Sequence, residues 1–301
     1  MTLPTRLLCL TSSICALTFF YSCKAQDKSI IAEGAELTLV ASDYKFTEGP
    51  AVDKEGNVFF TDQPNNRILK WSLDGNISVY MENAGRANGL YFDHKGNLLA
   101  CADEKNELWQ INSDKSITVL VDDFEGKKLN GPNDLWVDPK GGIYFTDPYY
   151  QRDYWSRTKP ELEKQQVYYL APGKSELIVV VNDLVQPNGI IGSKDGKTLY
   201  VADIGDKKTY SYTINEEGIL SNKTLFTEMG SDGITLDNQG NLYLTGKGVT
   251  VFNKSGVQIA HIPIDQGWTA NVTFGGKNQK TLFITALNSL YTLEMNVKGV
   301  R

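Results

Sequence analysis

One phrase recurs six times along the chain and constrains its fold more than any other feature. Each copy contains a polar residue, a short apolar run that closes on Asp, Ser or Gly, a turn rich in Gly and Asn, and a second apolar run. The second runs begin at residues 58, 98, 143, 199, 242 and 282, so they lie 40 to 56 residues apart. A repeat of roughly 40–45 residues with four short strands is typical of a β-propeller blade.

Two further apolar runs complete the four strands of each unit. In the first unit, residues 68–72 precede an Asp-Gly turn and residues 77–80 follow it. Short runs of β-branched and aromatic residues separated by such turns are strand and hairpin signals. We therefore predict an all-β chain in which residues 35–301 form one six-bladed β-propeller. The alternative, a pair of β-sandwiches, does not explain one phrase that repeats in phase.

The last repeat lacks one strand. Its apolar runs lie near residues 272–274, 282–285 and 289–293, and an additional run at residues 37–41 precedes the first repeat. This early run can supply the missing strand, which closes the ring and removes exposed sheet edges. We therefore expect the N-terminal strand to join the C-terminal blade.

The first 22 residues have the pattern of a secretory signal peptide. Arg6 is the only charge before Lys24, and residues 7–20 are largely apolar. Ser22-Cys23 loosely resembles a bacterial lipoprotein cleavage box, so we expect Cys23 to be the lipidated first mature residue, followed by a tether over residues 23–34. The alternative is an ordinary signal peptide cut near the same place. Either way we expect an exported bacterial protein, in the periplasm or on the outer membrane, with a lipid on Cys23 as its only membrane contact.

Composition excludes several classes of protein. The chain has 30 Lys and Arg against 36 Asp and Glu, and this net charge of −6 argues against nucleic-acid binding. Only His94 and His261 are present, which excludes a zinc site of three histidines. Cleavage removes two of the four cysteines, and Cys101 lies in an apolar run, so we expect it to be a buried thiol without a disulfide.

One polar position recurs at the entry to each predicted innermost strand. The six residues are Glu48, Asn88, Asn133, Asn188, Asp232 and Asn271. Innermost strands line the central channel, so these side chains form one ring at one end of it. Carboxylate and amide oxygens suit Ca²⁺, Mg²⁺ or Mn²⁺ better than Zn²⁺, and the two carboxylates neutralise one divalent ion. The alternative is that the amides only cap strand ends.

Four segments carry a resemblance to a known family. Residues 46–50, 129–134, 186–189 and 231–234 resemble signature segments of the gluconolactonase family, which includes regucalcin (senescence marker protein) and is related to diisopropyl-fluorophosphatase. Residues 124–130 and 271–276 are similar to its bacterial secreted or lipoprotein branch. The resemblance covers about residues 36 to 295 and implies a six-bladed propeller.

The resemblance also implies an activity. Family members are metal-dependent lactone hydrolases, and their Glu, Asn, Asn and Asp metal ligands correspond to Glu48, Asn133, Asn188 and Asp232. We expect one divalent cation, foremost Ca²⁺, with Mg²⁺, Mn²⁺ or Zn²⁺ also open. It would polarise the carbonyl of a sugar lactone or sugar-acid ester while Asp232 acts as general base on water. Asp232 as nucleophile, a related esterase or phosphotriesterase, and a non-catalytic ligand-binding propeller stay open.

Further residues are candidates for substrate contact. Asn88, Asn271 and Asn130 can bind hydroxyl groups, and Arg86 is expected at the same rim. The longest spacing, 56 residues, marks an insertion that includes residues 148–158 and is rich in aromatic and Arg residues. We expect it to form a lid in which Trp155 and Arg157 contact the substrate. The alternatives are strand-end caps and a loop that packs between blades.

Overall fold

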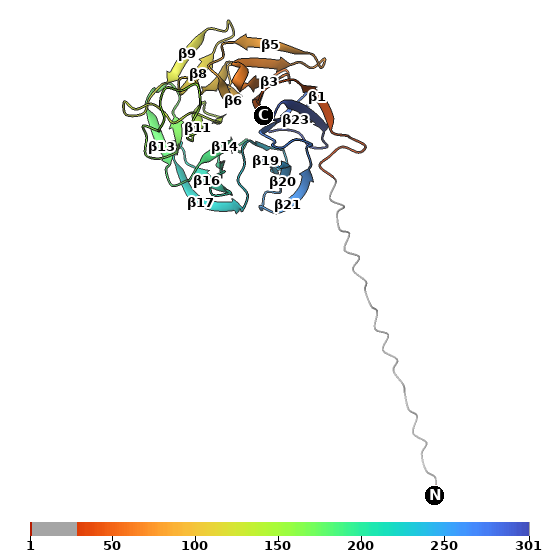
Figure 1. The fold of residues 1–301 in the computed structure, drawn as a ribbon. Coiled ribbons are helices and arrows are strands. Elements are labelled where there is room, and N and C mark those ends of the chain that lie inside the picture. Colours follow the sequence, from red (N-terminus) through yellow and green to blue (C-terminus); the bar gives the residue numbers. More distant parts are fainter. Residues whose placement is uncertain (2–28, 301) are drawn as a thin grey trace.

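Six four-stranded antiparallel sheets stand around one axis in the computed structural model, which describes residue 1 and residues 29–300 (Figure 1). Five of the blades run from an innermost to an outermost strand in chain order, as in β2-β3-β4-β5, and the sixth takes its outermost strand from the start of the described chain. The prediction of an all-β, six-bladed propeller is confirmed. The predicted signal peptide and Cys23 lie outside the described residues.

The elements are β1 (Thr38–Ser42), β2 (Thr47–Val52), β3 (Val58–Asp62), the 3₁₀ turn η1 (Gln63–Asn65), β4 (Arg67–Trp71), β5 (Ile77–Glu82), β6 (Ala87–Phe92), β7 (Leu98–Ala102), β8 (Glu107–Ile111), β9 (Ile117–Val121), β10 (Leu135–Val137), β11 (Ile143–Asp147), β12 (Gln166–Leu170), β13 (Leu177–Val181), β14 (Pro187–Gly192), β15 (Thr198–Asp203), β16 (Lys208–Ile214), β17 (Leu220–Thr227), β18 (Ile234–Leu236), β19 (Leu242–Gly246), β20 (Gly248–Phe252), β21 (Gln258–Ile262), β22 (Asn271–Gly275), β23 (Thr281–Ala286) and β24 (Ser289–Glu294).

The ring closes as predicted. The sixth blade has the order β22-β23-β24-β1, and β1 pairs antiparallel with β24, with Thr38 opposite Thr292. The described part of the segment expected as a tether, residues 29–34, continues beside this blade. There Ile31 forms an isolated bridge with Met295. The two ends of the chain thus hold the ring together by backbone pairing.

The recurring Asp-Gly-Asn turns have a direct physical cause. In the first blade the Asp53 carboxylate accepts hydrogen bonds from the backbone N–H groups of Gly56 and Asn57, both at 2.8 Å. Gly56 has φ +102°, a value that side-chain-bearing residues rarely adopt. Asp93 accepts the N–H of Asn97 in the same way in the second blade. These turns return the chain from the innermost strand to the second strand.

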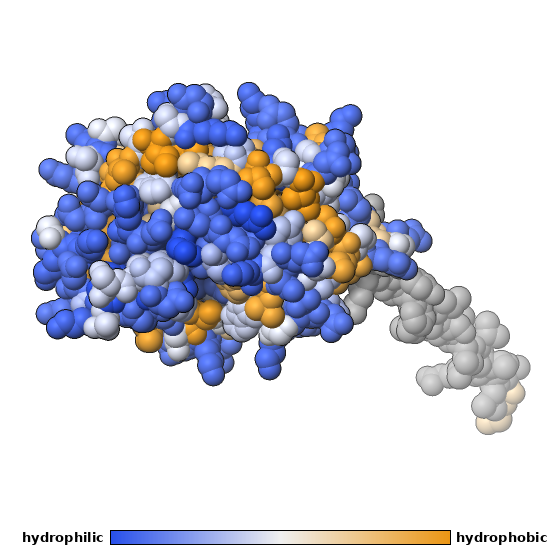
Figure 2. Space-filling view, turned by 45° about the horizontal axis from the view of Figure 1, so that its top comes forward, coloured by the Kyte–Doolittle hydropathy of each residue, from blue (hydrophilic) through white to orange (hydrophobic). Residues whose placement is uncertain are grey.

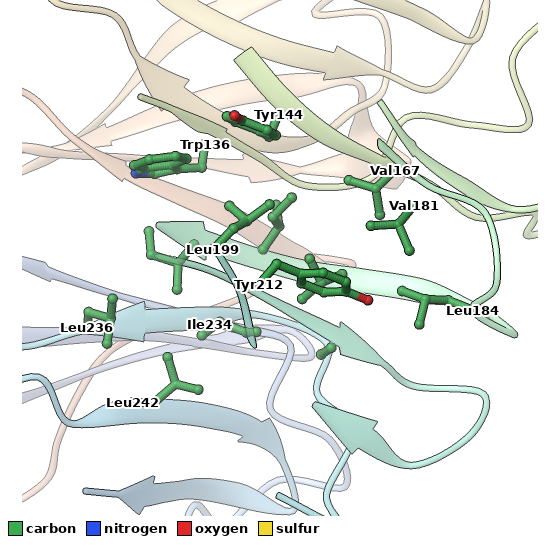
Figure 3. Close-up of a cluster of buried hydrophobic side chains, with 14 of the residues drawn as sticks. Trp136, Tyr144, Val167, Val181, Leu184, Leu199, Tyr212, Ile234, Leu236 and Leu242 are labelled. Carbon is green, nitrogen blue, oxygen red and sulfur yellow. The ribbon is translucent and has the colours of Figure 1, made fainter. Parts of the chain in front are cut away.

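The apolar core lies between neighbouring blades. One cluster joins Trp136 and Tyr144 of the third blade to Leu199 of the fourth and Ile234 and Leu242 of the fifth (Figure 3). The rings of Trp136 and Tyr144 stack with centroids 5.7 Å apart. Cys101 is a buried thiol in a similar cluster, as its apolar run predicted.

The face seen in Figure 2 is mostly hydrophilic, with separate hydrophobic patches. Exposed apolar side chains such as Val79 and Val119 lie on the outermost strands β5 and β9. Within the described residues, the structure has no helix long and apolar enough to cross a membrane.

Adjacent innermost strands approach each other most closely at glycines. A Cβ placed on Gly49 would lie 2.0 Å from the Asn88 carbonyl oxygen. A Cβ on Gly233 would lie 2.0 Å from Asn271 Oδ1 and 2.6 Å from Asn271 Cα. Each of these glycines directly follows a residue of the predicted ring. The absence of a side chain there lets consecutive blades meet at the axis.

The variant Gly233→Ala tests this close approach. The new methyl group clashes with both the side chain and the backbone Cα of Asn271, so we expect a loss of about 3 kcal/mol in the free energy of unfolding. Gly267→Ala is the control, because its nearest neighbour is a Leu287 methyl at 3.5 Å. Chemical denaturation measures both variants, and equal stability of the two would contradict the packing argument.

Candidate active site

The structure brings the six ring residues together at one end of the channel. Each lies within the first residues of an innermost strand or just ahead of it, and direct contacts connect neighbours. Asn271 Nδ2 donates to Glu48 Oε2 at 3.0 Å, which joins the last blade to the first. The Gly89 N–H donates to the Asn133 carbonyl at 2.7 Å, which joins the second blade to the third. These contacts connect the polar position of one blade with that of the next at two places around the axis.

Buried carboxylates position the chain where it enters three of these strands. Asp147, at the end of β11, accepts the backbone N–H groups of Asn130 at 2.9 Å and Gly131 at 2.8 Å. Asp62 and Asp203 receive pairs of backbone N–H groups in the same way from residues 45–46 and 185–186. Each of these segments lies two or three residues before a ring residue. The hydrogen bonds therefore fix the position of the backbone that carries the ring side chain.

Two carboxylates of the ring share the channel. Glu48 is buried, and burial raises its pKa well above the usual value, with a further rise from the charge of Asp232. Burial of its carboxyl group raises the pKa of Asp232 to about 6, although Trp268 and Asn188 lower it by hydrogen bonding. Trp268 Nε1 donates to Asp232 Oδ2 at 2.6 Å. Both groups are thus costly to ionise without a positive charge nearby.

A third carboxylate, Asp134, lies below the ring and was not among the predicted site residues. Burial raises its pKa to about 7, and Asp232 contributes to that rise. Its Oδ1 accepts the Leu135 N–H at 2.9 Å, and its side chain lines an apolar cavity of about 270 Å³ farther down the channel. The predicted segment 129–134 contains this residue. Asp134 directly follows the ring residue Asn133, so it lies one position outside the polar position that recurs in each blade.

Whether a cation fits between the ring residues depends on the oxygen atoms of the amide side chains. Within residues 29–300 no three Asp, Glu, His or Cys side chains converge as a metal site. A cation therefore needs amide oxygens as additional ligands. Asn188 is 1% exposed, and its Oδ1 is buried with no hydrogen-bond partner among the described residues. A buried oxygen that lacks a hydrogen-bond partner and lies beside ionisable carboxylates is the kind of ligand atom that a hard divalent cation requires.

The other predicted substrate residues lie in or beneath the insertion, which spans residues 148–165 between β11 and β12. Asn130 Nδ2 donates to the Lys164 carbonyl at 2.9 Å, and Arg157 donates to the carbonyls of Leu129 and Asn130. Trp155 Nε1 donates to the Asp103 carbonyl at 2.9 Å. These polar groups hold the insertion on the propeller, whereas Asn88 and Asn271 belong to the ring itself.

The insertion is anchored on the second blade. The buried Asp103 carboxylate accepts Arg152 Nε at 2.8 Å, the Tyr154 hydroxyl at 2.5 Å and Gln63 Nε2 at 3.2 Å. The guanidinium group of Arg86 lies 4.4 Å from the centre of the Tyr154 ring. The anchor therefore combines one buried carboxylate with two arginines at the rim.

Tyr150 and Arg152 were also not among the predicted site residues. The Tyr150 hydroxyl accepts a hydrogen bond from Asn188 Nδ2 at 2.9 Å, and Arg152 lowers the pKa of Asp232 by its charge. The sequence indicated only that this segment was rich in aromatic and Arg residues. Nothing in the pattern distinguishes the side chains that reach the ring from those that fasten the loop.

The fold and the site define a six-bladed β-propeller with a buried acid-and-amide site on its axis. The chain belongs to the SMP-30/Gluconolactonase/LRE-like family, whose model matches residues 46–288.

Individual relatives agree with this assignment. A gluconolactonase of Zymomonas mobilis is 28% identical, over 90% of this chain and 84% of its own. The structure of a gluconolactonase from Xanthomonas campestris has a TM-score of 0.82 and 30% identity, over 88% of this chain and 91% of its own. Regucalcin of Agrobacterium tumefaciens, described as a calcium-binding protein, shares the fold, with a TM-score of 0.73 and 19% identity over 87% of this chain and 94% of its own.

The raised pKa values predict an unusual dependence of stability on pH. Between the ordinary pKa of 3.8 and the raised values of about 6 for Asp232 and about 7 for Asp134, the folded chain binds more protons than the unfolded chain. The stability of chelator-treated protein should therefore fall as pH rises from 5 to 8. Because a bound cation favours the ionised carboxylates, added Ca²⁺ should raise Tm more at pH 8 than at pH 5. Thermal melts measure this, and equal shifts at both pH values would contradict it.

Proposed function

We propose that the protein is a lactone hydrolase of the gluconolactonase type that depends on a divalent cation. Family membership supports the reaction class. The observation that carries the cation dependence is the buried Asn188 Oδ1 near Asp232, which has no hydrogen-bond partner among the described residues. Glu48, Asn133, Asn188 and Asp232 would hold the ion. A bound cation would supply Lewis-acid polarisation of the lactone carbonyl.

Calcium is the cation that this set of residues favours. Two carboxylates and two amides supply only hard oxygen atoms, which Ca²⁺ accepts with flexible geometry. The calcium-binding description of the Agrobacterium relative agrees with this choice. Mg²⁺, Mn²⁺ and Zn²⁺ are the comparisons that an assay must include.

Asp232 is the proposed general base. Its pKa of about 6 lies close to neutral pH, where a base is both ionised and able to accept a proton. The bond from Trp268 to Oδ2 fixes the orientation of the carboxylate. In this scheme Asp232 takes a proton from the water that attacks the carbonyl carbon. The ring C–O bond then breaks, and Asp232 passes the proton to the leaving oxygen to give the hydroxy acid.

The ring and the insertion suit a polyhydroxylated substrate. Asn88 Oδ1 is buried without a partner in the described part of the chain, so it can accept a substrate hydroxyl. The aromatic side chains Tyr150, Tyr154 and Trp155 belong to the insertion, where they can pack against a sugar ring. A sugar lactone or sugar-acid ester meets both requirements. Export is part of the proposal, supported by the sequence of residues 1–23.

A panel of sugar lactones, assayed with chelator and with each cation added back, tests the reaction and its cation dependence together. We expect hydrolysis that chelator abolishes and Ca²⁺ restores. Hydrolysis that is unaffected by chelator would contradict the cation dependence. Absence of activity on every lactone with cation bound would contradict the reaction class.

Replacement of Asp232 by Asn tests the role of the base. We expect turnover to fall by about 10³-fold, with a smaller loss of cation binding, because the amide oxygen can still coordinate the ion. Asp265→Asn, at an exposed carboxylate, is the matched control and should keep full activity. A single turnover in ¹⁸O water separates the two mechanisms: label in the product alone supports attack by water, whereas label in Asp232 would show a nucleophilic carboxylate.

Truncation of Trp155 tests the lid. Loss of its bond to Asp103 and of its ring should loosen the insertion, so Trp155→Ala should raise KM several-fold and change kcat less. Ser156→Ala, an exposed neighbour in the same loop, is the control and should leave both constants unchanged. Steady-state kinetics on the best lactone of the panel give both constants. An unchanged KM for Trp155→Ala would contradict the proposal that the insertion is a lid over the substrate.

A further inference from the structure

We propose that Tyr150 of the insertion is a positioning residue that sets the affinity of the axial site for its cation, by fixing the side-chain amide of Asn188. This inference rests on the proposed function, because it assigns Asn188 Oδ1 to the cation. It adds a residue that lies outside the four proposed ligands and belongs to a neighbouring blade. It also connects the closure of the insertion to the occupation of the site.

An amide side chain can bind a cation with only one of its two ends. Asn188 Nδ2 donates to the Tyr150 hydroxyl at 2.9 Å. With the nitrogen end bound in this way, the oxygen Oδ1 is the end that has no hydrogen-bond partner among the described residues. A reversed amide would present its NH₂ group, which donates and cannot bind a cation, in place of this oxygen.

Tyr150 is held in place by contacts away from the axis. The guanidinium group of Arg152 lies 5.5 Å from the centre of the Tyr150 ring. Arg152 in turn donates to the buried Asp103 carboxylate at 2.8 Å. The connection therefore runs from Asp103 of the second blade, through the insertion of the third, to Asn188 of the fourth.

Asp103 can bind the insertion because its carboxylate does not hold the backbone of its own blade, as the corresponding carboxylates of other blades do. Asp62, Asp147 and Asp203 each accept backbone N–H groups from the segment that enters their own blade. Asp103 accepts none from the chain entering β6, within the described residues. There the Arg86 N–H donates to Asn66 Oδ1 at 2.6 Å instead. The Asp103 carboxylate is thus left to bind the insertion.

Cation binding and closure of the insertion should therefore support each other. Ordering of the insertion places the Tyr150 hydroxyl against Asn188, which orients the ligand oxygen before the ion arrives. Thermodynamic linkage requires the reverse effect of equal size, so a bound ion stabilises the closed insertion.

Calorimetric titration of the full chain with Ca²⁺ tests the inference directly. Tyr150→Phe removes only the hydroxyl, and we expect the Kd for Ca²⁺ to rise about 10-fold, as is typical for loss of a partner that orients a metal ligand. Tyr149→Phe is the matched control in the same loop, because among the described residues the Tyr149 hydroxyl bonds only to Gln151. It should leave the Kd within twofold of the original chain. Activity of Tyr150→Phe at limiting Ca²⁺ should recover when Ca²⁺ is raised.

A double-variant cycle separates orientation from a general structural role. Asn188→Asp places an oxygen at both ends of the side chain, so no orientation is needed. In that background Tyr150→Phe should change the Kd less than twofold. An equal 10-fold loss in both backgrounds would show a general structural effect and overturn the inference. Melting curves without cation confirm that the variants are folded.

The outcomes also separate this inference from the proposed function. If the original chain binds none of Ca²⁺, Mg²⁺ or Mn²⁺, the cation proposal is wrong and this inference is wrong with it. If the original chain binds Ca²⁺ and Tyr150→Phe binds it equally well, the inference alone is wrong.

Discussion

The close approach of neighbouring innermost strands is the constraint on which the site depends. The positions of missing Cβ atoms show how little space remains: one on Gly189 would lie 2.7 Å from the Asp232 carbonyl oxygen, and one on Gly89 would lie 2.5 Å from that of Asn133. Glycine is needed because any side chain would separate the blades. With the blades in contact, the polar residue just before each glycine is held near the axis.

This packing also explains the electrostatics of the channel. Side chains held so close to the axis lose most of their water, and three of them are carboxyl groups: Glu48, Asp134 and Asp232. Because burial penalises the charged form, all three pKa values are raised. In the proposed function, the same penalty would make a divalent cation favourable there, since its charge would compensate that of the carboxylates. The geometry that closes the propeller would then also be the geometry that prepares the site for the proposed ion.

The sequence predicted the parts of the fold that depend on local patterns. The Asp-Gly-Asn turns and the apolar runs repeat in phase, so the number of blades, the closing strand and the ring could be read from them. The contacts of the insertion could not. Asp103 directly follows β7, much as Asp62 and Asp147 end their strands, yet its carboxylate binds Arg152 and Tyr154 rather than backbone. That difference depends on Asn66 and on a loop more than forty residues away, which no local pattern contains.

The location of the insertion decides what it can do. A loop that follows the second strand of the third blade begins beside the ring, since β11 ends at Asp147 and Asp147 holds the chain that leads to Asn133. From there it reaches Asp103 on one side and Asn188 on the other. A loop of the same composition on the first or fifth blade would not lie between these two partners. In the proposed function, the insertion would therefore both cover the substrate and influence the cation, and a change that frees it from Asp103 should affect both roles together.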